Sequence, residues 1–440
     1  MLRNLPAFLV RVTQRVPITS KTAASTQRIN RALSTLSQQP RYPSVTAPTN
    51  ARNHDNPVIP PQHQSMHPAR PVLNAWQTTA IQALINEQKN CPETPIYSLG
   101  KIHGIEILAK DERAFPSKNL KHRLARALLL RALRLGLINK NTCLFEASSG
   151  GTAYSEAYFA KLLGLSYTAV LAKGTPQSKL DAIKKQGGFV VECEPGQDIA
   201  TATELGKQSG CYFINQFDHG SDATNPDHNI ASEITAQFKK LNLPMPTVSI
   251  CGPGTGVTAT IQGKYFQWHG LPTKVILGDP ENSVFYSAWQ SGDRRITTQI
   301  GSRIGGIGRQ CIPNAFDHTV VTEIIPIPDA KSIAARRFLR EVFGLHTGGS
   351  TGTNFAVCLE VIERMRLKNE TGSVLMIIGD QGALYDNTYD NEQWLKEKNI
   401  YIQPYLEEMY KLPLQSIHKP TLLSLRNSHQ EKPTEKRFRF

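Results

Sequence analysis

Hydrophobic positions along this chain alternate between two spacings. Short apolar runs of four to seven residues have the length of buried strands, and the segments between them carry apolar residues at helical spacing. The strands predicted in this way are 105–110, 142–146, 167–171, 189–194, 247–251 and 274–278, and the helices include 121–135, 153–163 and 177–186. This alternation predicts an α/β fold with parallel or mixed sheets covered by helices, and it favours two such sheets.

The helix predicted at 121–135 begins with a charged residue on its apolar stripe. Lys121 is followed on that stripe by Ala125, Leu128, Ala132 and Leu135. Lys118 instead shares a stripe with His122 and Arg126, a face expected to contact water or a partner. A lysine at a helix end usually extends its ammonium group to solvent. The alternative is a desolvated lysine, whose lowered pKa suits Schiff-base chemistry.

Three turns rich in glycine and other small residues stand at predicted helix starts: FEASSGGTA, SICGPGTGVTAT and Gly348–Thr353. The free N–H groups and positive dipole end of a helix attract an anion there. Counted from Gly254, the second turn also fits a dinucleotide pattern, and Asp279 ends the next strand. A P-loop is excluded, because no Gly-Lys-Ser/Thr follows. A phosphate on a smaller cofactor, with a lysine for its aldehyde, accounts for the turns and Lys121 together.

The net charge of +14 over 440 residues is concentrated at the two ends. Residues 1–54 hold eight Lys or Arg and no Asp or Glu, and the body of the chain is nearly neutral. Such a distribution gives little support to a nucleic-acid role. No apolar run approaches the roughly 18 residues of a membrane span. The seven cysteines are scattered without a CxxC pair, which argues against a zinc site or a disulfide framework.

The basic N-terminal segment, residues 1–54, has the composition of a mitochondrial transit peptide. Arg31–Thr35 resembles a matrix-processing site. We therefore expect the protein in the mitochondrial matrix, with a disordered basic arm on a cytoplasmic protein as the alternative. The segment 416–440 is expected to be a mobile basic tail.

Five motifs occur in the order seen in pyridoxal-phosphate (PLP) enzymes of the cysteine synthase and cystathionine β-synthase family. They are Lys121-His122-Arg123, SSGGT at 148–152, GTGVT at 254–258, IGGIG at 304–308 and GGSTGTN at 348–354. The resemblance covers roughly residues 72–405. It is closest to the cysteine desulfhydrase branch, through runs such as LKHRLARALLL and GDQGALYDNTYDNEQWL.

This resemblance implies a two-lobed fold type II enzyme that binds pyridoxal 5'-phosphate and forms a homodimer. The larger, PLP-binding lobe would comprise 55–120 and 230–415, and the smaller lobe 121–229. Lys121 would be the catalytic lysine, which holds the cofactor and then removes the α-proton of the substrate. The other cofactor-binding residues would be Gly151, Gly254, Thr255, Gly256, Val257 and Thr258, with Ser350 at the pyridine nitrogen. The substrate carboxylate would meet Ser148, Ser149, Gly150 and Thr152, assisted by Gln216.

Three departures from the family pattern concern the cofactor site. Many relatives carry Asn at position 151, where this chain has glycine. Val257 replaces a glycine of the phosphate loop, and its β-branched side chain requires a negative φ. The pair Lys118-Asn119 replaces the usual small Gly-Ser pair. Such changes are expected to retune the substrate pocket or to weaken PLP binding.

The function expected from these features is a PLP-dependent lyase. It would act by β-elimination on L-cysteine or a close β-substituted amino acid and release sulfide, pyruvate and ammonia. Two alternatives stay open from the sequence. One is β-replacement, in which a second nucleophile captures the intermediate, and the other is a catalytically impaired scaffold that keeps the fold.

Overall fold

The computed structural model describes residues 71–415 and 419–423. The predicted transit peptide and most of the predicted tail lie outside the described residues. The strands are β1 (Ile96–Ile102), β2 (Ile105–Asp111), β3 (Cys143–Ala147), β4 (Ser166–Ala172), β5 (Phe189–Cys193), β6 (Cys211–Phe213), β7 (Val248–Cys251), β8 (Lys274–Pro280), β9 (Glu323–Ile327), β10 (Ser373–Ile378), β11 (Leu414–Gln415) and β12 (Thr421–Leu422).

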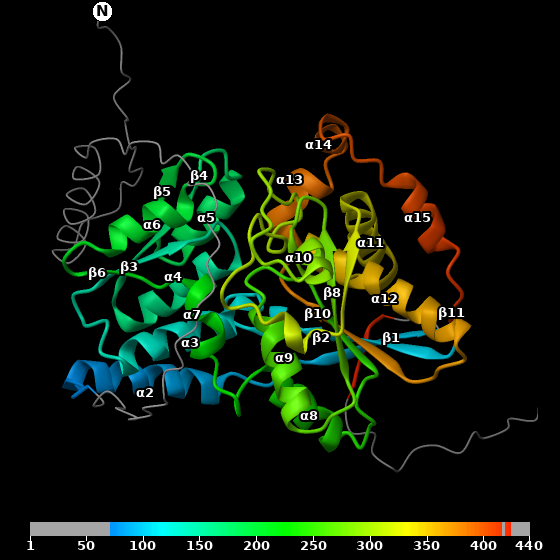
Figure 1. Ribbon diagram of the computed structural model, residues 1–440, viewed down its shortest axis with the longest axis horizontal. Coiled ribbons are helices and arrows are strands. Elements are labelled where there is room, and N and C mark those ends of the chain that lie inside the picture. Colours follow the sequence, from blue (N-terminus) through cyan, green and yellow to red (C-terminus); the bar gives the residue numbers. More distant parts are fainter. Residues whose placement is uncertain (1–70, 416–418, 424–440) are drawn as a thin grey trace, which may run out of the picture.

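The helices surround these strands (Figure 1). They are α2 (Ala75–Asn90), α3 (Lys121–Arg134), α4 (Gly151–Leu163), α5 (Gln177–Lys185), α6 (Asp198–Gly206), α7 (Gln216–Ala223), α8 (Ile230–Lys240), α9 (Val257–Trp268), α10 (Phe285–Ser291), α11 (Asp329–Phe343), α12 (Gly349–Leu367), α13 (Asp386–Tyr389), α14 (Glu392–Glu397) and α15 (Gln403–Tyr410). Among the described residues, no helix is both long and apolar enough to span a membrane.

The strands form two separate sheets, as the hydrophobic pattern predicted. The smaller sheet has the order β5-β4-β3-β6 and is parallel throughout. The larger sheet has the order β11-β1-β2-β10-β7-β8-β9, with β12 beside β1, and its strands from β2 to β9 are parallel. Figure 1 shows the two sheets in neighbouring halves of the molecule. The lobe boundaries given above stay a prediction.

Helix α3 lies between α2, α4 and α7. Its stripe of Ala125, Leu128 and Ala132 is fully buried, as predicted, but Leu135 just past its end is 48% exposed. The prediction that the face of His122 and Arg126 contacts water is wrong, since both side chains are buried. The reason lies in α2, because Glu87 of that helix pairs with both of them.

Candidate active site

The carboxyl ends of the parallel strands β7 and β10 lead to one region, where the first turn of α3 also lies. Leu120, just before Lys121, donates its N–H to Gly379 O (2.8 Å) directly after β10. The Lys121 side chain is close enough to Asp380, which follows Gly379, and to Cys251, at the end of β7, for both groups to affect its pKa. Ligands of open α/β sheets bind at such strand ends.

Desolvation lowers the pKa of Lys121, and the nearby carboxylate of Asp380 only partly opposes this shift. The lysine therefore does not extend its ammonium group freely into solvent, which favours the second of the two interpretations of Lys121. Its backbone N–H donates to Asn119 Oδ1 (2.8 Å), so the start of α3 is fixed from the preceding loop. A neutral amine at a fixed position is what attack on an aldehyde requires.

Two buried polar atoms near this lysine have no hydrogen-bond partner among the described residues. They are Asp380 Oδ1 and the hydroxyl oxygen of Tyr154. The other oxygen of Asp380 accepts a bond from the hydroxyl of Tyr385 (2.5 Å), and burial raises the pKa of Asp380 to about 6. The amine of Lys179, a half-buried residue, lies 5.5 Å from the centre of the Tyr385 ring. Unpaired buried polar atoms are costly, so their grouping indicates a site for a polar ligand.

The helices α4, α9 and α12 each begin at this site without a side-chain cap. Their caps are Gly150, Gly256 and Gly348, and none of the three has an acidic residue in its first turn, within the described residues. Apart from Val257, whose N–H has Thr255 Oγ1 at 3.4 Å, their first N–H groups are therefore free of the side-chain acceptors that usually cap helices. Such ends suit anions, among them the phosphate of a cofactor and the carboxylate of a substrate.

The IGGIG loop, 304–308, packs directly against the predicted phosphate loop. Gly308 donates its N–H to Pro253 O (2.7 Å), and a Cβ on Gly254 would collide with the carbonyl oxygen of Gly306. The hydroxyl of Tyr389 donates to Arg303 O (2.8 Å) and accepts from Gly305 N (2.7 Å). Both glycine-rich motifs thus form one tight cradle, whose shape permits no side chain at 254.

The substitution of Val257 for glycine is accommodated locally. Val257 does not have a positive φ, as expected for a β-branched residue, whereas Gly256 before it has a φ of 79°. The Val257 side chain lies against Gly220 of α7, where an added Cβ would come within 2.5 Å of it. Its N–H remains at the start of α9, with Thr255 Oγ1 at 3.4 Å. The phosphate-binding potential of this turn is retained.

The other two departures, Gly151 and Lys118-Asn119, belong together. A Cβ at Gly151 would lie 2.6 Å from Asn119 Oδ1 and 3.3 Å from Lys121 Cγ. The Asn119 side chain thus occupies the space in front of position 151, and only glycine fits opposite it. Lys118 has a φ of 59°, a conformation that favours glycine, in agreement with the small pair found at this point in relatives.

The residues present therefore fit PLP. Three helix starts without a side-chain cap, a glycine cradle and a desolvated lysine surround unpaired buried polar atoms, and this combination matches a phosphate, an aldehyde and a polar ring.

A family model described as "Pyridoxal-phosphate dependent enzyme" matches residues 87–380. The chain belongs to this family. Its cofactor is accordingly pyridoxal 5'-phosphate, and it is an enzyme of the class expected from the motifs. L-cysteine desulfhydrase Cds1 of Mycobacterium tuberculosis is 36% identical over 342 residues, which cover 75% of this chain and 92% of the relative.

Two solved structures share the fold of this PLP-dependent enzyme. O-ureido-L-serine synthase has a TM-score of 0.61 at 22% identity, covering 70% of this chain and 95% of the other. An O-acetylserine dependent cystathionine β-synthase from Helicobacter pylori has a TM-score of 0.59 at 23% identity, covering 69% and 97%. The α/β fold expected from the sequence, with helix-covered parallel and mixed sheets, is confirmed.

The predicted substrate loop lies at the start of α4 in this PLP-dependent enzyme. Ser148 follows β3, and its hydroxyl accepts a bond from Gly150 N (3.2 Å). Thr152 donates to Gln216 Oε1 (2.6 Å), and Gln216 Nε2 donates to Ala147 O (3.4 Å). Ser149, between Ser148 and Gly150, is partly exposed. The structure brings the loop and Gln216 together, and their contact with substrate stays a prediction.

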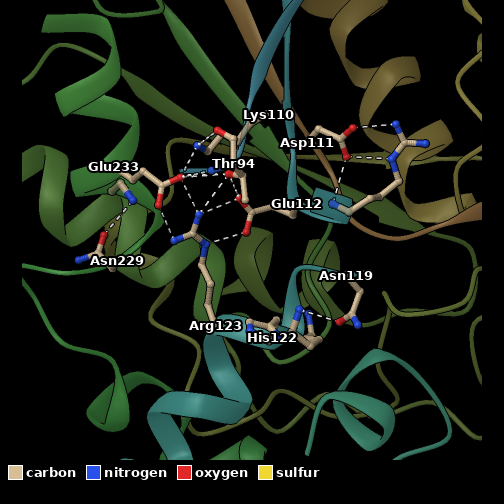
Figure 2. A network of polar contacts seen from close by, with 12 residues as sticks. Thr94, Lys110, Asp111, Glu112, Asn119, His122, Arg123, Asn229 and Glu233 are labelled. Atoms are coloured by element: carbon tan, nitrogen blue, oxygen red, sulfur yellow. Dashed lines mark hydrogen bonds and ion pairs between the residues drawn. The ribbon is translucent and has the colours of Figure 1, made fainter. Parts of the chain in front are cut away.

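Arg123, the last residue of the Lys-x-Arg motif, points away from this site into a buried ionic network (Figure 2). Its guanidinium donates to Glu112 Oε2 (2.7 Å) and to Glu233 Oε2 (2.9 Å). Glu233 also pairs with Lys110 (2.6 Å). These contacts join η1 (Glu112–Ala114), α3, α8 and β2, so the arginine anchors the helix that carries Lys121.

Sequence reasoning missed Asp380, Tyr154 and Lys179 as site residues. Asp380 and Tyr385 lie in the run GDQGALY, whose likeness to the desulfhydrase branch was the available signal. Tyr154 lies on α4 and Lys179 on α5, two helices that pack against the smaller sheet. No motif in the sequence singles out either residue. Only the spatial arrangement brings them to Asp380.

Proposed function

We propose that this PLP-dependent enzyme catalyses β-elimination on L-cysteine or a close β-substituted amino acid, with release of sulfide, pyruvate and ammonia. The observation that carries the proposal is the desolvated Lys121 beside the unpaired buried oxygen of Asp380. The similarity to L-cysteine desulfhydrase Cds1 over nearly the whole of that relative supports this substrate.

Lys121 has two tasks in this proposal. Its amine would hold the cofactor through the aldehyde, and the same amine would accept the proton from the substrate's α-carbon. PLP, when bound, withdraws electrons from the substrate's α-carbon. Desolvation lowers the pKa of the Lys121 amine and so favours its neutral form, which both tasks require.

The remaining residues bind and orient. The N–H groups of the uncapped start of α4, with Ser148, Ser149, Gly150 and Thr152, are suited to the substrate carboxylate. Gln216 is held beside them by Thr152. Gly254–Thr258 at the start of α9 are suited to the phosphate, because their cradle excludes side chains.

Ser350 opens α12 and is assigned to the pyridine nitrogen. It is 9% exposed, and a Cβ at Gly379 would lie 3.1 Å from its hydroxyl oxygen. A neutral hydroxyl leaves the ring unprotonated and a weaker electron sink than an aspartate would. This environment favours elimination, in which the leaving group departs promptly, over transamination.

The setting of the enzyme is also proposed. We infer a homodimer of two-lobed subunits, the larger lobe formed by 55–120 and 230–415 and the smaller by 121–229. We further infer import into the mitochondrial matrix, directed by residues 1–54. A reporter fused to this segment should reach mitochondria, and a reporter that stays in the cytosol contradicts the inference.

The test of the catalytic proposal is an absorbance spectrum of the purified enzyme with PLP, before and after L-cysteine. We expect a band of lysine-bound cofactor that disappears in Lys121→Ala and persists in Lys118→Ala, the matched control. Lys118 is exposed, three residues away. Sulfide and pyruvate should form in the wild type and in Lys118→Ala, but not in Lys121→Ala. A band that responds to cysteine without these products supports β-replacement, and no band at saturating PLP supports the scaffold.

A further inference from the structure

A cavity of about 490 Å³ lies beside α3. Its walls come from α2, α3, the segment before α8 and the first turns of α9. The apolar part of the wall includes Ile85, Leu124, Ala127, Leu130, Ile230 and Ile261. Its volume lies within the range of small-molecule pockets, roughly 300–1,000 Å³.

The cavity is distinct from the cofactor site, although the two adjoin. Lys121, Val257 and Thr258 touch both. None of Ser350, Asp380 and Tyr154 is among the residues that line the cavity. The unpaired polar atoms that mark the cofactor site therefore do not face it.

The ionisable side chains of the wall are all basic. Besides Lys121, the lining includes Lys89, Arg123, Arg126 and Arg134, and it includes no aspartate or glutamate. Arg123 and Arg126 are paired with carboxylates behind the wall. Lys89 and Arg134 are exposed at its rim. An apolar cavity with cations at its rim is complementary to an anion that has an apolar body.

The ends of this chain are unsuitable occupants. Residues 1–54 hold eight Lys or Arg and no Asp or Glu, so a cationic rim repels them. The segment from Lys419 to the end is also predominantly basic. The occupant favoured by charge is therefore a separate, anionic molecule.

We propose that this cavity is a regulatory site for an amphipathic anion, a small molecule with an apolar body and a carboxylate or sulfonate group. The regulation, though not the binding, rests on the proposed function of the cofactor site. The anionic group lies at Lys89 and Arg126, with Arg134 at the far end of the cavity along α3, and the apolar body lies against Ala127 and Leu130. Occupancy is coupled to Lys121 through hydrogen bonds of the α3 turn.

The first part of this coupling runs from the cavity wall to the buried histidine. Arg126 donates to Glu87 Oε2 (2.7 Å), and the other oxygen of Glu87 lies 2.8 Å from His122 Nε2. An anion beside Arg126 competes with Glu87 for the guanidinium. The position of Glu87, and with it the contact to His122, is thereby sensitive to the ligand.

The second part runs from His122 to the cofactor site. His122 Nδ1 lies 3.0 Å from Ser117 Oγ, to which Asn119 Nδ2 donates (3.1 Å). Asn119 in turn accepts the bond from Lys121 N. A shift of His122 is therefore transmitted to the residue that fixes the start of α3.

Binding is tested with the fluorescent anion 8-anilinonaphthalene-1-sulfonate, titrated into the full-length holoenzyme, and with decanoate as competitor. We expect saturable binding that decanoate reverses. Ala127→Trp, which fills the cavity, and the double variant Lys89→Glu/Arg134→Glu should each weaken binding at least tenfold. Leu135→Trp and Lys118→Glu are matched controls, since neither residue lines the cavity. Melting curves verify that every variant is folded.

Equal binding of the probe by the wild type and both cavity variants overturns the proposed site. Regulation is measured separately, as the apparent PLP affinity with and without decanoate. We expect a change of at least twofold in the wild type and none in Ala127→Trp. A decanoate effect of equal size in both, or in neither, overturns the regulation. These measurements use no cysteine and no turnover, so their outcome is independent of the proposed reaction.

Discussion

The first turn of α3 presents two charged residues to two very different environments. Arg123 is surrounded by acceptors from Glu112, Glu233 and Thr94, and these carboxylates raise its pKa despite its burial. Lys121, two residues earlier, has no comparable set of partners, and desolvation lowers its pKa. One turn of helix thus contains a charge that is fully compensated and an amine that burial disfavours as a cation.

The difference distinguishes polar groups that are paired within the protein from polar groups that are left for a ligand. On the Arg123 side, positive and negative groups are matched within the protein, so the network needs no ligand. On the Lys121 side, Asp380 Oδ1 and the Tyr154 hydroxyl oxygen are left unpaired among the described residues. Native proteins rarely tolerate such atoms. Their presence beside a desolvated lysine indicates where an external polar molecule completes the structure.

The largest expected effect follows from removing the amine itself. Lys121→Ala should lower the rate of sulfide release by about 10³-fold or more, because it removes both cofactor attachment and the proton acceptor. Its free energy of unfolding without PLP should be unchanged or higher, since a desolvated amine is lost. The measurement is steady-state kinetics with urea unfolding of the same samples. Substantial unfolding of the variant contradicts the contrast drawn here.

On the Arg123 side of the turn, we expect a substitution to reduce stability. Glu233→Gln leaves Lys110 and Arg123 with one carboxylate fewer and should reduce the free energy of unfolding by about 3–5 kcal/mol. Lys110 and Arg123 hold the pKa of Glu233 at about 2, so the effect should be present across pH 5–8. Urea unfolding measures it. Glu392→Gln, at an exposed pair with Arg337, is the control and should cost about 1 kcal/mol or less.

The sequence was sufficient for elements whose signal is local. The predicted strand 105–110 and the predicted helices 153–163 and 177–186 agree with β2, α4 and α5 to within two residues. Their apolar periods and glycine-rich starts are read from neighbouring residues. The order of motifs likewise predicted the fold, and two of the motifs, SSGGT and GTGVT, lie at strand-to-helix turns.

Features that depend on distant contacts could not be read in this way. The face of His122 and Arg126 has the polar composition of a surface, and only the arrival of Glu87 from α2 makes it buried. Asp380 has no local signature that distinguishes it from a loop aspartate. Its unpaired oxygen lies against Gly348, where an added Cβ would collide with it.

The pH dependence of stability tests whether Asp380 is a buried carboxyl group without a full set of partners. Burial raises its pKa from 3.8 to about 6. A raised carboxyl pKa contributes stability that is complete below pH 3.8 and lost as the pH rises through about 6. Asp380→Asn removes this loss. Relative to wild type, the variant should therefore gain up to about 3 kcal/mol between pH 4 and pH 7.5, by urea unfolding without PLP. A gain that is independent of pH contradicts the assignment.

The smallest expected effect concerns the glycine that faces Asn119. A Cβ added at Gly151 would lie 2.6 Å from Asn119 Oδ1, so Gly151→Ala should reduce the free energy of unfolding by about 1–3 kcal/mol. The measurement is urea unfolding of the apoenzyme, beside PLP titration. Asn119→Ser in the same chain removes the atom that collides, and the double variant should recover part of the loss.

The control for this pair is Gly150→Ala, one residue earlier, because a Cβ there has nothing within 4 Å. It should leave stability nearly unchanged, although it lies in the same turn. Positions 119 and 151 are independent if Gly151→Ala does not change the free energy of unfolding. They are also independent if the loss in the double variant equals the sum of the losses in the two single variants. Coupling between them means instead that the two departures from the family pattern are one exchange. The amide side chain at 119 then takes the place of the amide that many relatives carry at 151. The space beside the first turn of α3 remains available to the cofactor.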